Sequence, residues 1–162
     1  MSELAGLARL NGLGADVAAA ELLACCGSTA WARALSASRP FADEEALFDT
    51  AERIWWGLTP EEWRQAFAAH PRIGERGTGW SEAEQAGARA AAAPVLVELA
   101  AANRAYEARF GHVFLICATG KSAGEMLAAL RARMGNAPEE ELRVAAGEQA
   151  KITRLRLRRL LG

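Results

Sequence analysis

One of the two histidines in this 162-residue chain, His70, directly precedes a proline at the end of an amphipathic stretch. The residue before a proline is disfavoured in the α region, so we expect a helix to stop at His70 and its ring to project from the helix end. Histidine is also the side chain whose ordinary pKa lets it take and give a proton near neutral pH. His70 is therefore our first candidate for acid–base chemistry; a purely structural histidine at a helix end is the alternative.

A second candidate is the stretch Ser81-Glu82-Ala83-Glu84, which has the spacing of a capping box at the start of a helix. The backbone N–H groups gathered at a helix N-terminus suit an anionic ligand, and Glu84 there can accept a hydrogen bond from a ligand N–H or O–H. The capping box alone explains the spacing equally well, and the two interpretations are compatible.

The apolar run from Val113 to Ala118 is too short for a buried helix, so we expect an extended buried segment. Its simplest role is core packing. In a helical protein, however, the N–H and C=O groups of an extended segment need partners, and a polar ring of a ligand can supply them.

Other polar motifs carry less weight. His112, which follows Gly111, is expected to be a helix-terminal residue favoured by the helix dipole. Gly120-Lys121-Ser122 resembles the end of a phosphate-binding loop, but the glycine that the motif requires five residues earlier is replaced by leucine, so we reject nucleotide binding. Four arginines near the C-terminus predict a solvated helix end, from which one can turn inward to hold a carboxylate or carbonyl: Arg154, Arg156, Arg158 and Arg159.

The elements that must position these residues are helices. Alanine and leucine are abundant, β-branched residues are sparse, and 51% of the residues are hydrophobic. We predict one all-α domain over residues 1–162, a single-domain bundle of about seven to nine helices with one short extended buried segment. The expected helices cover 15–26, a short turn at 31–35, Asp43 to about Gly57, a start at Thr59-Pro60-Glu61-Glu62 running toward His70, a start at Ser81, Pro94 to Phe110, Ser122 to Met134, and Pro138 to about Leu161, with a loop over 74–80.

Charge and cysteine content narrow the class of protein. A net charge of −1 predicts no general attraction to nucleic acid or to anionic membranes. Cys25, Cys26 and Cys117 have no C-x-x-C spacing, which argues against a disulfide framework or a zinc site and for a reducing compartment. Because Met1 to Leu10 lacks a continuous apolar run, we expect no signal peptide and a cytoplasmic location.

Several motifs recur together in an order that is more specific than any one of them. This ordered set resembles the OHCU decarboxylase family (2-oxo-4-hydroxy-4-carboxy-5-ureidoimidazoline decarboxylase), which completes the route from urate to (S)-allantoin. The resemblance spans the whole chain and rests on Trp31-Ala32, Arg39-Pro40-Phe41, His70-Pro71, Ser81-x-x-Glu84-Gln85, Asn103-x-x-Tyr106, Phe110-Gly111-x-x-Phe114-x-Ile116-Cys117-Ala118, Lys151-Ile152 and Arg156-Leu157.

The resemblance implies an all-α enzyme, usually a homodimer, that needs neither a metal nor an organic cofactor. It implies that His70 is the catalytic acid/base, that Glu84 forms a hydrogen bond with the substrate and that Arg156 binds the substrate. The implied lining of the substrate site is Pro71, Ser81, Glu82, Ala83, Glu84, Gln85, Phe114, Leu115, Ile116, Cys117, Ala118 and Arg156.

The chain departs from the family pattern mainly between His70 and Ser81. Family members often carry Asp-Leu-Ala-Gly after His-Pro and a longer loop, whereas Arg72-Ile73-Gly74 leads here into a shorter one, as in a bacterial branch. Two alternatives to an OHCU decarboxylase are open. In the first, the chain is a divergent relative that acts on another carboxylated ureido or imidazoline compound. In the second, it is a helical interaction module in which His-Pro merely ends a helix.

Overall fold

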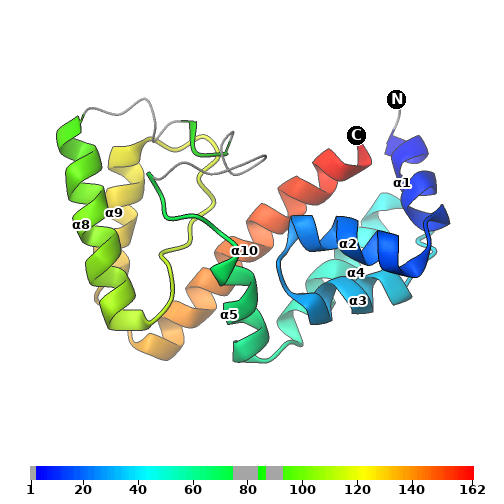
Figure 1. The fold of residues 1–162 in the computed structure, drawn as a ribbon, viewed down its shortest axis with the longest axis horizontal. Coiled ribbons are helices and arrows are strands. Elements are labelled where there is room, and N and C mark those ends of the chain that lie inside the picture. The colour runs from blue at the N-terminus through cyan, green and yellow to red at the C-terminus, as the bar shows by residue number, and fades with distance from the viewer. Residues whose placement is uncertain (1–2, 75–83, 87–92) are drawn as a thin grey trace. The chain divides into compact units, whose positions relative to one another are not determined.

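A computed structural model describes residues 3–74, 84–86 and 93–162, and over these residues it contains eight helices and no strand. The all-α prediction is confirmed (Figure 1). The expected helix start at Ser81 and most of the loop over 74–80 lie outside the described residues. The helices are α1 (Glu3–Gly12), α2 (Ala15–Cys25), α3 (Thr29–Ala37), α4 (Glu44–Trp56), α5 (Pro60–Ala68), α8 (Ala93–Phe110), α9 (Ala123–Arg133) and α10 (Pro138–Leu161).

The contacts divide the chain into two compact units. The first unit comprises Met1–Ala66 and Ala150–Gly162, and the second comprises Phe67–Gln149. Helix α10 contributes its N-terminal half to the second unit and its C-terminal half to the first. Within the first unit α2 packs on α3, and within the second α8 packs on α9 (Figure 1).

Side chains cap two helices of the first unit at the starts that the sequence predicted. The Asp43 carboxylate accepts the N–H of Ala46 at 2.7 Å, which satisfies a free donor in the first turn of α4. The Thr59 hydroxyl accepts the N–H of Glu62, and the Glu62 carboxylate accepts the N–H of Thr59, so a capping box forms at the predicted start of α5.

Helix α3 is longer than the short turn expected over 31–35. It begins at Thr29 because the buried Ser28 hydroxyl accepts the N–H of Trp31 at 3.2 Å and acts as the N-cap. The Trp31 ring is fully buried, and its N–H donates to the carbonyl of Ala51 on α4 at 3.0 Å. The signal for the longer helix was thus the Ser28 cap, three residues before the apolar pattern becomes clear.

The core of the second unit surrounds the run that was expected to be extended. Residues 113–118 form neither helix nor strand, and 114–118 are all buried, as predicted. Phe114 and Ile116 pack in one cluster with Tyr106 of α8 and Met126 of α9. Helix α8 ends before Gly111, whose φ of +79° is the left-handed conformation that glycine adopts readily at a helix C-terminus.

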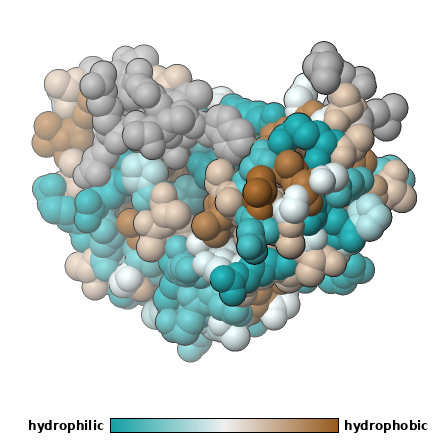
Figure 2. Space-filling model, turned by 45° about the vertical axis from the view of Figure 1, so that its right-hand side comes forward, coloured by the Kyte–Doolittle hydropathy of each residue, from teal (hydrophilic) through white to brown (hydrophobic). Residues whose placement is uncertain are grey.

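The surface mixes polar and apolar residues. On the face shown in Figure 2, hydrophobic residues are interspersed with hydrophilic ones. The large hydrophobic side chains that are exposed on described residues include Val17 and Leu23 of α2, Trp56 of α4 and Val97 of α8. None of the helices in the described part of the chain combines the length and apolar character needed to cross a membrane.

Candidate active site

His70 lies just beyond the end of α5, as the His-Pro pair predicted. Helix α5 ends at Ala68, and the N–H of His70 donates to the carbonyl of Phe67 at 3.1 Å. The side chain is partly buried, and its Nε2 lies 2.6 Å from Oε1 of Gln149 on α10. The proline therefore ends the helix, and a contact 79 positions away in sequence orients the ring.

The partner on Nε2 sets the tautomer of the His70 ring. An amide oxygen only accepts hydrogen bonds, so Nε2 carries the proton, and the neutral ring has its lone pair on Nδ1. Gln149 is completely buried, which keeps water away from this bond. Gln149 was not predicted from the sequence, because a glutamine in the middle of a long helix carries no local signal.

The chain after His70 is held by side chains from two other parts of the second unit. The side-chain N–H of Asn103 on α8 donates to the carbonyl of Ile73 at 2.9 Å. The N–H of Gly74 donates to the side-chain oxygen of Gln85 at 3.0 Å, and Gln85 is buried. The structure thus brings Gln85, a predicted lining residue, to the segment that carries His70 and Pro71; Ser81, Glu82 and Ala83 lie outside the described residues.

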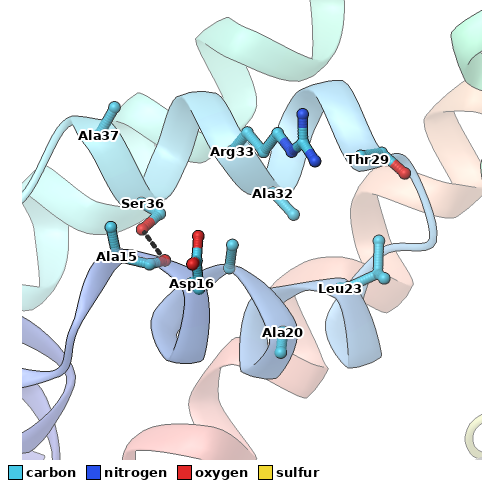
Figure 3. Close-up of a pocket in the computed structure, with 10 residues that line it drawn as sticks. Ala15, Asp16, Ala20, Leu23, Thr29, Ala32, Arg33, Ser36 and Ala37 are labelled. Carbon is cyan, nitrogen blue, oxygen red and sulfur yellow. Dashed lines mark hydrogen bonds between the residues drawn. The ribbon is translucent and has the colours of Figure 1, made fainter.

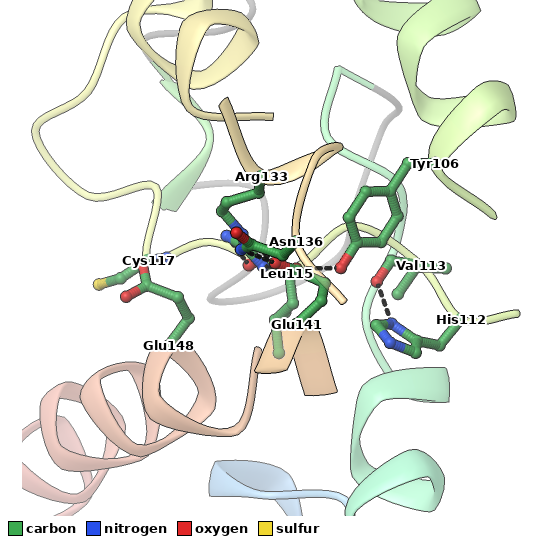
Figure 4. A network of polar contacts seen from close by, with 9 residues as sticks. All are labelled: Tyr106, His112, Val113, Leu115, Cys117, Arg133, Asn136, Glu141 and Glu148. Atoms are coloured by element: carbon green, nitrogen blue, oxygen red, sulfur yellow. Dashed lines mark hydrogen bonds and ion pairs between the residues drawn. The ribbon is translucent and has the colours of Figure 1, made fainter. Parts of the chain in front are cut away.

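Two side chains also hold the backbone of the extended segment 113–118 (Figure 4). The N–H of Cys117 donates to a carboxylate oxygen of Glu148 at 3.0 Å. The carbonyl of Leu115 accepts from Arg133 of α9 at 2.8 Å. These two backbone groups therefore have protein partners, and a ligand would have to use others.

The charges around Cys117 show what lies near the extended segment. Burial raises the pKa of the Cys117 thiol, and the carboxylates of Glu148 and Glu84 raise it further, while Thr119 and Lys121 act in the opposite direction. Glu84, one of the predicted site residues, is among the groups that act on this thiol. The thiol stays protonated near neutral pH and is not a nucleophile there.

A buried polar network connects the extended segment to α9 and to the start of α10 (Figure 4). Glu141 is completely buried and accepts hydrogen bonds from the hydroxyl of Tyr106, from Asn136 and from the guanidinium of Arg133. Because Arg133 also donates a hydrogen bond to the carbonyl of Leu115, the network holds the extended segment in place.

Arg156 belongs to the first unit, where it is 8% exposed and its guanidinium lies 3.4 Å from the carbonyl of Ala24. The other three arginines of the tail are exposed, and two of them, Arg154 and Arg158, lie over the Phe48 ring at 4.5 and 5.6 Å. The expectation that one arginine of this tail turns inward is confirmed.

The first unit also has a groove of about 780 Å³ between α2 and α3 (Figure 3). Half of its lining residues are alanine, and it carries one charge of each sign, Asp16 and Arg33. None of the residues predicted for the site lines it. Across the parts of the chain that the structure describes, no group of three or more His, Cys, Asp or Glu side chains is placed to hold a metal ion.

Comparison with known proteins agrees with the resemblance seen in the sequence. The model of the OHCU decarboxylase family matches residues 11–158. The uric acid degradation bifunctional protein TTL of Arabidopsis thaliana is 42% identical over 84% of this chain, which spans 45% of the plant protein's length. The 2-oxo-4-hydroxy-4-carboxy-5-ureidoimidazoline decarboxylase of Haloferax volcanii is 32% identical over 74% of each chain. A crystal structure of an OHCU decarboxylase in the presence of (S)-allantoin superimposes with a TM-score of 0.80 at 43% identity, over 87% of this chain and 96% of that one.

Proposed function

The chain belongs to the OHCU decarboxylase family, and on this premise we propose that it converts 2-oxo-4-hydroxy-4-carboxy-5-ureidoimidazoline to (S)-allantoin and CO2 in urate breakdown. The observation that carries the proposal is the family match over residues 11–158, which takes in parts of both units. This span also supports the expectation that the chain acts as one family domain.

The substrate itself accounts for much of the chemistry. When the bond between the ring carbon and its carboxylate breaks, CO2 leaves and the electron pair passes to the neighbouring imine of the ring. The hydroxyl on the ring carbon then loses its proton as a C=O bond forms, the electron pair returns to the former imine carbon, and one proton must reach one face of that carbon to give the S product. The protein has to hold the ring in one orientation and deliver that proton, and both are tasks for side chains and backbone groups.

We assign the proton transfer to His70. Its place at a helix end and its buried amide partner support this role, because they fix one ring orientation and one tautomer. General acid–base catalysis contributes roughly 10²–10⁴-fold to a rate. Glu84 accepts a hydrogen bond from a ring N–H or hydroxyl of the substrate, and Arg156 binds a carboxylate or carbonyl with its planar guanidinium.

The predicted lining residues remain part of the proposal: Pro71, Ser81 to Gln85, and Phe114 to Ala118. We also propose that the chain acts as a homodimer in the bacterial cytoplasm. Its cysteines support a reducing compartment, since all three are unpaired and buried. Sedimentation equilibrium of the purified chain checks the dimer.

The test generates the unstable substrate in situ from urate and follows the circular dichroism of the allantoin that forms. We expect the native chain to produce (S)-allantoin rapidly and without added metal. We expect His70→Ala to lose nearly all turnover, on the order of 10²-fold or more, with an unchanged far-ultraviolet spectrum.

The matched control is the other histidine. His112 packs against Phe67, Tyr106 and Phe110, so His112→Phe keeps its aromatic contacts and should retain most of the activity. Racemic product at the uncatalysed rate from the native chain would contradict the proposed function. Full activity in His70→Ala would contradict the role of His70 alone.

A further inference from the structure

We infer that two consecutive residues of α10, Glu148 and Gln149, are positioning residues of this site. Gln149 holds the His70 ring in its Nε2-protonated form, and Glu148 holds the backbone at Cys117. The contacts stand on the structure alone. Their consequence for turnover rests on the proposed function.

The bond from Gln149 to His70 has the features of a fixed contact. The two atoms are 2.6 Å apart, and the glutamine side chain comes from a continuous helix and is completely buried. A neutral acceptor fixes the tautomer without adding charge beside the ring. A carboxylate at the same place would instead favour the imidazolium form.

Glu148 performs the corresponding task for the extended segment. Its carboxylate accepts the N–H of Cys117 at 3.0 Å, in a segment with no strand partner for this donor among the described residues (Figure 4). Successive residues on a helix point about 100° apart, so one turn of α10 can reach His70 with one side chain and Cys117 with the next. His70 and the extended segment 113–118 are thereby held by the same rigid helix, α10.

A buried glutamine that merely satisfies its hydrogen bonds would have the same contact, so the test must read the ring itself. Nitrogen-15 NMR of the full chain with labelled histidine shows which ring nitrogen carries the proton in the neutral form. The chain contains only two histidines, and His70→Ala assigns the two sets of signals.

His112 is an internal control in the same spectrum. Its Nδ1 lies 3.0 Å from the carbonyl of Val113, which only accepts, so its proton is on Nδ1. We expect opposite tautomers: Nε2–H for His70, with that proton protected from exchange with water, and Nδ1–H for His112. A native His70 ring protonated on Nδ1 would overturn the inference.

Variants of Gln149 then connect the tautomer to turnover. In Gln149→Leu we expect the protected Nε2–H signal to be lost and kcat to fall roughly 10- to 100-fold, as when an outer hydrogen-bond partner is removed from a metal-bound histidine. In Gln149→Glu the acceptor remains, so the signal should return while the pKa of His70 moves upward. Because Gln149→Glu keeps the shape of the side chain, it remains informative even where the leucine variant does not fold.

The matched control is Gln65→Glu, the same chemical change at an exposed glutamine that bonds to Thr29 in the first unit. It should leave the His70 signals and kcat unchanged. A Gln149→Leu variant that folds and keeps both the protected signal and native kcat would overturn the inference. Absence of decarboxylase activity in the native chain would overturn the proposed function instead, because the NMR readout does not depend on turnover.

Discussion

At the scale of single residues, Glu141 shows how a buried side chain outside the predicted site can support one of its segments. Its carboxylate is completely buried and meets the Arg133 guanidinium at 2.5 Å, with that side chain only 11% exposed. Tyr106 donates its hydroxyl to the same carboxylate, and burial followed by this hydrogen bond raises the pKa of Tyr106 well above its usual range. Removal of one partner from such a pair leaves an uncompensated buried charge.

We therefore predict that Glu141→Gln lowers the free energy of unfolding by about 3–5 kcal/mol, the typical cost of breaking a buried ion pair. Activity should fall as well, because Arg133 also holds the carbonyl of Leu115 in the extended segment. Urea denaturation followed by far-ultraviolet circular dichroism measures the stability.

The control for this prediction is Glu98→Gln. Glu98 pairs with Arg131 at 3.5 Å, but both side chains are more than half exposed. An exposed pair contributes less than about 1 kcal/mol, so this variant should be close to native. Equal losses in the two variants would show that burial of the pair does not determine its contribution.

At the scale of elements, several helix starts were predictable because capping is local, although the Ser28 cap of α3 was missed. The bonds at Asp43, Thr59 and Ser122 involve residues three positions apart, and all three form. The partners of the site residues were not predictable in this way. Gln149 is 79 positions from His70 and Glu148 is 31 positions from Cys117, and only the packing of α10 brings them together.

Helix α8 offers a prediction about how an element ends. Gly111 has a φ of +79°, and a Cβ there would meet no atom within 4 Å, so a side chain would suffer from backbone strain alone. We expect Gly111→Ala to lower the free energy of unfolding by about 1 kcal/mol. Thermal denaturation of the variant beside the native chain measures the loss.

Gly135, just after α9, is the matched control because it also has open space around its Cβ position but no positive φ. Gly135→Ala should be neutral or stabilise the protein by about 0.4–1 kcal/mol, through reduced freedom of the unfolded chain. Similar effects of the two substitutions would show that the left-handed conformation is not the source of the cost.

At the scale of the whole molecule, buried thiol and phenol groups in the two units make the protein less stable at high pH. Burial raises the pKa of Cys25 to about 12 and that of Cys26 to about 11, from an ordinary value of 9.0. Burial and Glu141 likewise raise the pKa of Tyr106 in the second unit. A group with a raised pKa stabilises the fold fully below its unfolded value, and this contribution is lost as the pH rises toward the folded value.

We predict that the free energy of unfolding falls as the pH rises from 9 to 11. Each of Cys25 and Cys26 contributes up to about 1.4 kcal/mol per pH unit between its unfolded and folded pKa values. Urea denaturation at fixed pH steps measures this slope. A Cys25→Ala/Cys26→Ala variant should start from a lower stability at pH 7, because both side chains are fully buried and leave cavities. Its stability should nevertheless decline less steeply above pH 9. A slope equal to that of the native chain would mean that these two thiols ionise alike in the folded and unfolded states, in spite of their burial.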